Sequence, residues 1–172
     1  MKKVIMASAV ALAVSGCFGR APEAPLAPAR PAVAIRDAAA PIWSIAQFTP
    51  ARLAGEWRQV AGFGAADCRG GAVQFRQAGG QLQAKGSLCF AGRLQAISSP
   101  VQPTGPGRLR VEGRDWWVVW VDTDYRTLAI GTPDGSFGFL LNRGGALPSD
   151  RMQAAAEVFD FNGYRISQMQ RY

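Results

Sequence analysis

The sequence predicts an all-β fold: an eight-stranded antiparallel up-and-down β-barrel with one C-terminal helix packed outside and a short final strand. From about residue 50 onward, apolar runs alternate with turn residues about every 8–12 positions, a spacing typical of sandwiches and barrels. The 172 residues include 20 Gly and 11 Pro, more than a helical protein usually carries. A single helical pattern follows the eighth run.

The elements follow from the positions of these turn residues. Eight strands are expected at residues 55–63, 71–77, 81–89, 93–98, 107–112, 115–122, 126–132 and 136–142. Ser149, as N-cap, and Asp150 then resemble the start of a helix. Its apolar face is expected to comprise Met152, Ala155, Ala156 and Phe159, at the i, i+3, i+4 and i+7 spacing. Gly163 would end this helix, and residues 164–170 would form a short ninth strand.

The last three barrel strands indicate which side chains face inward. Hairpin loops at residues 122–125 and 133–136 would place Val119 opposite Leu128 and Ile130 opposite Phe139, and opposite residues share one face of a sheet. The uniformly large, apolar face is therefore predicted to be the interior: Trp117, Val119, Val121, Leu128, Ile130, Phe137, Phe139 and Leu141. The other face, predicted to lie outside, carries Trp116, Val118, Trp120, Thr127, Ala129, Gly131, Gly138 and Leu140.

The first 45 residues are predicted to be an address and a tether rather than part of the barrel. Residues 1–17 read as a signal peptide, with Lys2 and Lys3 followed by an apolar run too short to span a bilayer. The stretch 14–17 resembles the lipobox of bacterial lipoproteins, which implies lipid attachment at Cys17; the alternative is an ordinary signal peptide. Phe18 resembles the outer-membrane sorting pattern, which implies a periplasm-facing anchor. Residues 18–45, rich in Ala and Pro, are expected to be a flexible tether, and 46–172 the barrel domain.

Composition argues against several classes of function. The sequence has no His, which removes the commonest general base and metal ligand. Its formal charge is +7, but the basic residues are scattered, whereas nucleic-acid binding usually requires a cluster. We therefore predict no enzyme activity, no catalytic residues, no metal, no cofactor and no nucleic-acid partner.

Two cysteines remain besides Cys17. In an oxidising compartment, Cys68 and Cys89 are expected to form a disulfide. A two-residue loop at Ala78-Gly79 would place them opposite each other, with Phe75 opposite Leu82. The alternative is a redox or metal-binding pair, which the absence of His and of a C-x-x-C motif disfavours.

Three segments resemble the lipocalin family. Gly55-Glu56-Trp57 opens the first strand like that family's G-x-W motif, and Thr123-Asp124-Tyr125 follows the sixth strand like its T-D-Y motif. Arg143 ends the eighth strand like its third conserved element. The resemblance implies that Trp57 closes the barrel floor beneath Arg143 and that Asp124 and Tyr125 order the loop there. The stretch 116–143 looks especially like bacterial outer-membrane lipocalins.

The resemblance also implies a function. It suggests a membrane-anchored binding protein for a small hydrophobic ligand, such as a fatty acid or lysophospholipid. The candidate ligand-binding residues are Trp117, Val119, Leu128, Ile130, Phe137 and Phe139. These side chains could equally fill the barrel, because eight strands leave an interior just wide enough for side chains or one small ligand. The alternative function is a protein–protein module like the bacterial metalloprotease inhibitors, small secreted barrels with a Cys pair but no helix after strand eight. The oligomeric state is left open.

Overall fold

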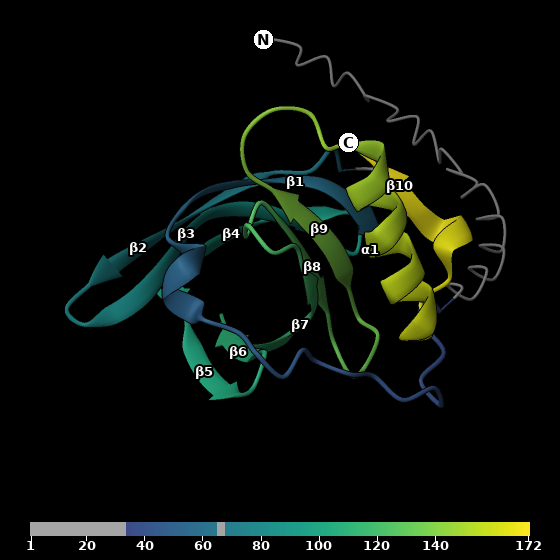
Figure 1. The fold of residues 1–172 in the computed structure, drawn as a ribbon, viewed down its shortest axis with the longest axis horizontal. Helices are drawn as coiled ribbons and strands as arrows, with labels where there is room; N and C mark the ends of the chain where they lie inside the picture. Colours follow the sequence, from purple (N-terminus) through teal and green to yellow (C-terminus); the bar gives the residue numbers. More distant parts are fainter. Residues whose placement is uncertain (1–33, 65–67) are drawn as a thin grey trace, which may run out of the picture. The chain divides into compact units, whose positions relative to one another are not determined.

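A computed structural model describes residues 34–64 and 68–172, so the predicted signal peptide and Cys17 lie outside the described residues. The fold is a nearly closed antiparallel barrel with one helix, α1, against its outer wall (Figure 1). The strands are β1 (Gly55–Phe63), β2 (Ala72–Ala78), β3 (Gln81–Phe90), β4 (Arg93–Pro100), β5 (Gln102–Gly105), β6 (Arg108–Val111), β7 (Arg114–Val121), β8 (Thr127–Gly131), β9 (Gly138–Asn142) and β10 (Met169–Arg171). The sheet order is β4-β3-β2-β1-β9-β8-β7-β6-β5, with β10 added beside β1. This architecture confirms the predicted fold class.

The two ends of this strand order belong to one bent stretch of chain. β4 pairs with β3, and β5, which follows Val101, pairs with β6. Val101 itself donates its N–H to the Leu82 carbonyl at 2.8 Å. Higher up, side chains bridge the gap: Glu112 accepts the Ser98 N–H at 2.6 Å, and Arg114 donates to Gln95 at 2.6 Å. The predicted fourth strand, 93–98, is therefore longer than expected and divides into two at Val101.

The β2–β3 hairpin differs from its predicted register. Its two loop residues are Gly79 and Gly80, whose φ angles of 59° and 78° suit the hairpin turns that glycine favours. Phe75 consequently pairs with Ala84, and the expected pairing with Leu82 is wrong. A loop placed one residue earlier would have forced Ala78 into this left-handed region.

A β-bulge in β7 reverses the predicted faces of part of that strand. Val118 pairs with Ile130, whereas Trp120 pairs with Ala129, so Val119 is the extra residue. Because one additional residue shifts the side-chain alternation, Trp116 and Val118 face inward, whereas Trp117 and Val119 face outward. The inward orientation predicted for Trp117 and Val119 is therefore wrong. Val121 and Trp120, beyond the bulge, face as predicted.

The next hairpin keeps its predicted register. Leu128 pairs with Leu141 and Ile130 with Phe139, which confirms the expected pairings of β8 and β9. The loop before β8 has five residues instead of four, because the Asp122 carboxylate accepts the N–H groups of Arg126 and Thr127 at 2.7 and 2.5 Å.

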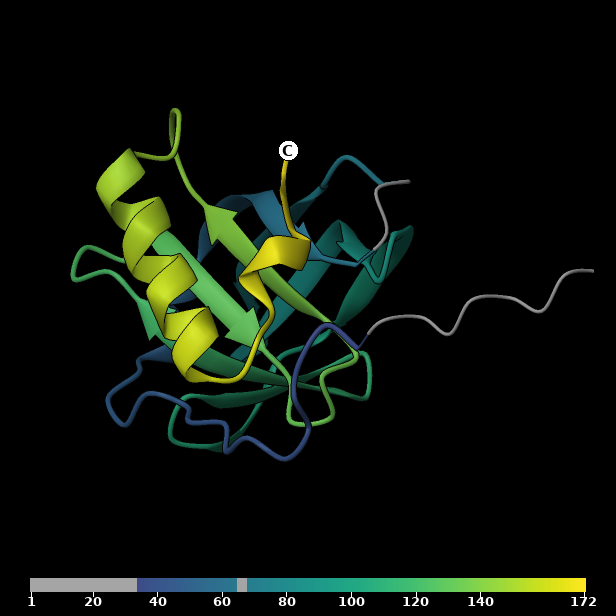
Figure 2. The same ribbon diagram turned by 90° about the vertical axis from the view of Figure 1, so that its right-hand side faces the viewer.

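Two apolar cores result, one inside the barrel and one between its wall and α1 (Ser149–Phe161). Figure 2 shows the helix lying along the outer face of the sheet. Met152, Ala155 and Phe159 are buried there, as the helical pattern predicts, and the small side chain of Ala129 lets the helix approach the sheet. Ser149 is the first helical residue, and the N-cap position belongs to Pro148. The ninth strand expected at residues 164–170 is replaced by the 3-10 helix η2 (Ile166–Gln168), and the strand that follows it, β10, is shorter than expected.

Residues 34–49, here called the strap, pack against the barrel. Arg36 is only 3% exposed and donates to the carbonyls of Asn162 at 2.8 Å, Pro133 at 3.0 Å and Ala40. Further along, the Ile45 N–H donates to the Val118 carbonyl at 2.9 Å. This hydrogen bond pairs a backbone carbonyl of β7 directly before the bulge. The strap then enters the 3-10 helix η1 (Pro50–Leu53). Residues 34–45, predicted to belong to the tether, are therefore part of the folded domain.

Candidate ligand site at the barrel mouth

The floor of the barrel consists of η1, Trp57 and Arg143. Trp57 is fully buried, and its indole N–H donates to the Leu53 carbonyl at 2.7 Å. The guanidinium carbon of Arg143 lies 3.9 Å from the centroid of the indole ring. Arg143 also donates to the carbonyls of Arg52 at 2.9 Å and Leu53 at 3.1 Å. Cation–π contact and these charged hydrogen bonds seal this end of the barrel.

The loop between β7 and β8 completes the floor. The Tyr125 hydroxyl accepts the Thr49 N–H at 2.9 Å, and the Arg52 guanidinium stacks on the Tyr125 ring at 3.8 Å. Thr123 contributes its carbonyl, which accepts from Arg52 at 3.2 Å. Asp124 is exposed and makes no hydrogen bond within the described part of the chain. The loop-ordering role expected for Asp124 belongs instead to Asp122.

The backbone conformation at Gly55, the first residue of the G-x-W motif, explains why a glycine stands there. Its φ of 122° is disfavoured for residues with a side chain, and an added Cβ would lie 3.6 Å from the Arg143 guanidinium. The glycine therefore lets the chain turn from η1 into β1 directly beneath that arginine.

At the opposite end, four aromatic side chains fill the top of the interior. This mouth cluster consists of Phe90, Trp116, Phe137 and Phe139. Edge-on contacts join Phe90 to Phe137 and Trp116 to Phe139, each with ring centroids 5.1 Å apart. Each ring is at most 5% exposed. The cluster forms because β3 ends, β7 begins and β9 begins at this end of the barrel.

One polar group within the mouth cluster has no partner. The indole N–H of Trp116 is buried and finds no acceptor among residues 34–64 and 68–172. An unsatisfied buried donor costs about 1–3 kcal/mol, so such groups are rare and call for an explanation. Below it, the interior is filled by the side chains of the inner core, each 5% exposed or less.

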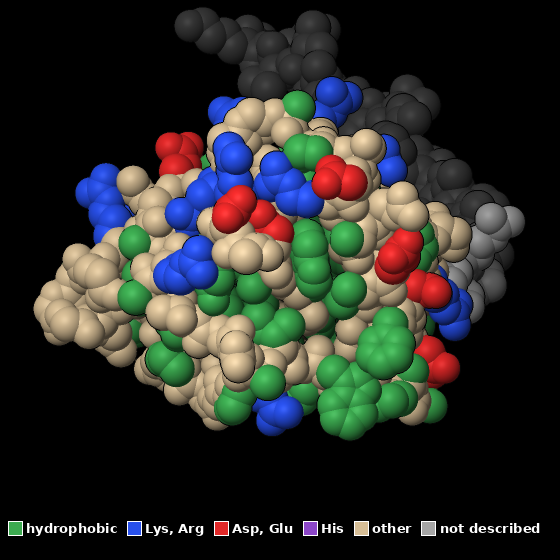
Figure 3. All heavy atoms as spheres, in the orientation of Figure 1, with side chains coloured by type: hydrophobic (Ala, Val, Ile, Leu, Met, Phe, Trp, Pro, Cys, Tyr) green, Lys and Arg blue, Asp and Glu red, His purple; other side chains and the backbone are tan. Residues whose placement is uncertain are grey.

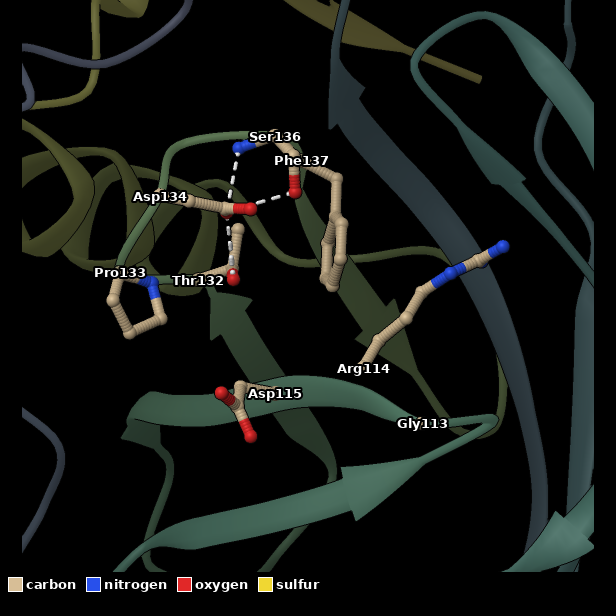
Figure 4. A pocket seen from close by; sticks show the side chains of 8 residues that line it. All are labelled: Gly113, Arg114, Asp115, Thr132, Pro133, Asp134, Ser136 and Phe137. Carbon is tan, nitrogen blue, oxygen red and sulfur yellow. Dashed lines mark hydrogen bonds between the residues drawn. The ribbon is translucent and has the colours of Figure 1, made fainter.

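A surface hollow of about 270 Å³ adjoins the mouth cluster (Figure 4). Its walls are the β8–β9 loop on one side and the start of β7 on the other, with Phe137 belonging both to the hollow and to the mouth cluster. Arg114 lines the opposite wall, and its guanidinium carbon lies 4.7 Å from the centroid of Phe90. The Phe137 ring therefore separates the hollow from the barrel interior.

The β8–β9 loop that carries Phe137 is fastened at two places. One Asp134 carboxylate oxygen accepts from the Thr132 hydroxyl at 3.0 Å and from the Ser136 N–H at 3.0 Å. Burial tends to raise the pKa of Asp134, but the hydrogen bonds from Ser136 and Thr132 outweigh it and lower that pKa. The buried Tyr164 hydroxyl accepts the Thr132 N–H and donates to the Phe137 carbonyl, both at 2.8 Å. Burial raises the pKa of Tyr164, so this hydroxyl stays protonated.

The structure brings four of the six candidate ligand-binding residues together in the interior. These are Leu128, Ile130, Phe137 and Phe139. Trp117 instead lies on the outer wall beneath the Arg108 guanidinium, 4.0 Å from its ring centroid, and Val119 packs in the core beside α1. The sequence analysis missed Phe90, and it placed Trp116 outside because the bulge was not foreseen.

The predicted disulfide between Cys68 and Cys89 is confirmed. Their Cα atoms lie 5.9 Å apart, although Cys89 pairs with Leu94 in the sheet and Cys68 precedes β2, so the expected strand pairing of the two is wrong. Gln59 fixes Cys89 by accepting its N–H at 2.7 Å and donating to its carbonyl at 2.9 Å. Within the described residues, no group of three or more His, Cys, Asp or Glu side chains could hold a metal ion.

Comparisons with known proteins agree with this architecture. The lipocalin-like domain family matches residues 100–172. Insecticyanin from the tobacco hornworm Manduca sexta superposes with a TM-score of 0.53 at 14% identity, over 76% of this chain and 82% of that one. Together these comparisons show a lipocalin fold for this chain.

Two further structures are similar to this chain. The cockroach allergen Per a 4 has a TM-score of 0.56 at 12% identity, covering 78% of this chain and 94% of that one. Lobster apocrustacyanin A1 has a TM-score of 0.49 at 18% identity, covering 72% and 78%. A search of curated protein sequences found no match.

No helix in residues 34–64 or 68–172 is both long enough and apolar enough to cross a bilayer.

Proposed function

We propose that this protein binds a small hydrophobic ligand that carries an oxygen acceptor, such as a fatty acid or a lysophospholipid, in the mouth of its barrel. The unpartnered Trp116 N–H is the observation that carries the proposal. A carboxylate, phosphate or ester oxygen beside this indole would satisfy the donor and remove its desolvation cost. The surrounding rings offer the apolar surface that the rest of such a molecule requires.

The ligand enters from the hollow by displacing Phe137. This ring is the only side chain of the mouth cluster that also lines the hollow. Apolar ligand surface then replaces the contacts that Phe137 gives up, at about 25 cal/mol per Å² buried. The interior need not be empty beforehand, because the ligand takes the place of a side chain that can move toward solvent.

Arg114 selects for a negatively charged group at the entrance. Its neighbour Asp115 is paired with Arg110 at 2.6 Å, and Arg114 itself donates to the neutral Gln95. Among the described residues, no carboxylate forms an ion pair with Arg114. The Asp134 carboxylate also lines the hollow, but it accepts hydrogen bonds from Thr132 and Ser136 of its own loop. The positive charge of Arg114 on the opposite wall favours fatty acids and lysophospholipids over uncharged hydrocarbons.

We also propose that the protein works at the periplasmic face of the bacterial outer membrane, anchored through a lipidated Cys17. The lipobox-like stretch before Cys17 supports the anchor. The Cys68–Cys89 disulfide supports an oxidising compartment. Mass spectrometry of the protein from a bacterial envelope tests the anchor, and an unmodified Cys17 would refute it.

The packed helix α1 favours this function over a protease inhibitor. The inhibitor barrels considered as the alternative lack a helix after the eighth strand, whereas α1 here buries Met152, Ala155 and Phe159 against the wall. An inhibition assay against secreted metalloproteases separates the two functions, because the lipocalin proposal predicts no inhibition.

Ligand binding is best tested with a donor-deletion variant. Residues 33–172 form one compact unit, so a chain beginning at residue 18 contains the whole folded domain and lacks the proposed anchor. Calorimetric titration of this chain should show saturable binding of oleate and much weaker binding of the matching alkene. Trp116→Phe keeps an aromatic ring but removes the donor, so it should reduce the preference for oleate over the alkene about tenfold or more.

Trp117→Phe is the matched control. It removes an indole from the adjacent position of the same strand, on the outer wall, and should leave the preference unchanged. Failure of the wild-type chain to bind either compound, or an equal loss of preference in both variants, would refute the proposal.

A further inference from the structure

Two large aromatic side chains are exposed on the outside of the barrel, on two segments that a hydrogen bond joins. Trp43 of the strap is 60% exposed, and Phe161, the last residue of α1, is 74% exposed. The Trp43 N–H donates to the side chain of Asn162 at 2.7 Å, which places the strap directly beside the end of the helix. Figure 3 shows large hydrophobic side chains gathered at the lower right, where Figure 1 places the end of α1 and the strap.

This aromatic pair stands on a fixed base. Asn162 is 1% exposed, donates to the Val158 carbonyl at 2.8 Å, and accepts Arg36 through its own carbonyl at 2.8 Å. The backbone beneath Trp43 and Phe161 is therefore tied to both the helix and the strap. Isolated exposed hydrophobic residues are common, but two exposed rings on joined and fixed segments are typical of a contact surface.

The position of the tether indicates what covers this surface. Ala34, the first described residue, accepts a hydrogen bond from Gln168, and Arg36 pairs with Tyr164, so the chain from Cys17 joins the domain beside the end of α1. The residues between Cys17 and Ala34 can span at most about 60 Å when fully extended. A lipid anchor on Cys17 would hold Ala34 within that distance of a bilayer, and the aromatic pair, which lies on the same part of the domain, would be kept at a high effective concentration there.

The chemistry of the pair suits the membrane interface. Tryptophan is enriched at the boundary between headgroups and acyl chains, because its ring is apolar and its N–H is polar. The surrounding charges are mixed: Arg108 donates to Ser44 beside Trp43, whereas Asp160 adjoins Phe161. Apolar contact rather than net charge would therefore dominate, and docking should depend little on salt.

We propose that Trp43 and Phe161 form a docking surface that lays the barrel against the bilayer to which Cys17 anchors it. This inference rests on the proposed anchor but not on the proposed ligand. It assigns the tether a limited role: the tether permits the domain to reach the bilayer, and the aromatic pair sets its orientation there.

The test uses the mature acylated protein reconstituted in phosphatidylethanolamine–phosphatidylglycerol vesicles, with a fraction of the lipid brominated on its acyl chains. Bromine quenches tryptophan emission only at short range, so the wild type should be quenched in both low and high salt. Trp43→Phe keeps an aromatic at the position and should lose most of the quenching. Trp117→Phe, which removes a half-buried indole elsewhere on the wall, should keep it.

Docking itself is tested with a second variant. Phe161→Ser leaves the Trp43 reporter in place and should reduce its quenching, whereas Leu94→Ser, at a 61% exposed position in β4, should not. Unquenched wild-type protein with an acylated Cys17 would overturn the docking surface, and an unacylated Cys17 would overturn the anchor on which it rests. If the wild-type protein formed a dimer in solution and Trp43→Ser disrupted it, the aromatic pair would be a contact between two copies of the chain, and the proposed docking to the bilayer would be wrong. Oleate affinity should be unchanged in both aromatic variants, which separates this test from that of the ligand.

Discussion

A single substitution at Tyr164 tests how the β8–β9 loop is fixed at the mouth of the barrel. Replacing it with Phe removes one oxygen and keeps the ring contacts with Phe63 and Phe159, at centroid distances of 4.9 and 5.1 Å. The Thr132 N–H and the Phe137 carbonyl, each 2.8 Å from that hydroxyl, would lose this partner. Leaving a buried group unsatisfied costs about 1–3 kcal/mol. We therefore expect Tyr164→Phe to lower the free energy of unfolding by about 2–4 kcal/mol.

Calorimetry and urea unfolding both measure this loss. A loss of that size corresponds to a decrease in Tm of about 5–15 °C for a domain of this length. Tyr172→Phe is the control, because the Tyr172 side chain is 37% exposed and its hydroxyl makes no hydrogen bond within the described residues. It should change the unfolding free energy by less than about 0.5 kcal/mol.

The pH dependence gives a second signature of the same hydroxyl. Because burial raises the pKa of Tyr164 above its ordinary value of 10.0, the folded state binds its proton more tightly than the unfolded state. The stabilisation is fully present below pH 10 and decreases as the pH rises above it. Tyr164→Phe should lack that decrease. A loss below about 0.5 kcal/mol, or an unchanged alkaline profile, would refute the view that Tyr164 fastens the β8–β9 loop.

Three further predictions concern the floor, the disulfide and the mouth loop. Arg143→Met should lower the unfolding free energy by about 2–3 kcal/mol, because it removes the cation over Trp57 and its bonds to η1; equal stability in urea would contradict that role. A Cys68→Ala, Cys89→Ala double variant should have a free energy of unfolding about 3 kcal/mol lower than that of the wild type. Wild-type protein that is unfolded under reducing conditions should show the same decrease. Asp134→Asn should cost about 1 kcal/mol or less at pH 7, because the carboxylate is exposed. Since hydrogen bonding lowers the pKa of Asp134, its contribution is present above pH 3.8 and is lost as the pH falls further, so the two proteins should converge in acid.

Local sequence patterns were sufficient for much of the fold. The first strand was predicted with its observed bounds: it begins at Gly55 and ends just before Gly64, and the structure shows a positive φ at both glycines. The register of β8 and β9 was also predicted, since a six-residue connection between them is set by Pro133, Asp134 and Gly135. These features depend on neighbours along the chain, which a sequence displays directly.

The register of β7 depends on distant residues and could not be predicted in this way. At the bulge around Val119, the Val118 carbonyl accepts the Ile45 N–H of the strap, and the Val118 N–H donates to the Gly107 carbonyl in the β5–β6 turn. Neither contact is visible in the alternation of Trp116 through Val121, which suits either face equally. A one-residue error in this strand exchanges Trp116, which faces inward, with Trp117, which faces outward. The prediction therefore also misplaced the indole N–H of Trp116 that the proposed site uses.

The strap was missed for a related reason. Its composition resembles the preceding Ala- and Pro-rich stretch, but Arg36 is held by carbonyls from two distant loops, around Pro133 and Asn162. A buried arginine bonded to carbonyls leaves no local pattern in the sequence. The aromatic pair that follows from the strap was consequently not foreseen either.

The indole resonances of the isotopically labelled chain beginning at residue 18 test the central claim most directly. The Trp116 signal is identified by its absence from the spectrum of Trp116→Phe. We predict that oleate moves this signal downfield as the site fills, whereas the signal of Trp57, whose N–H is already bonded to Leu53, stays in place. Saturable oleate binding that leaves the Trp116 signal unmoved would contradict the account.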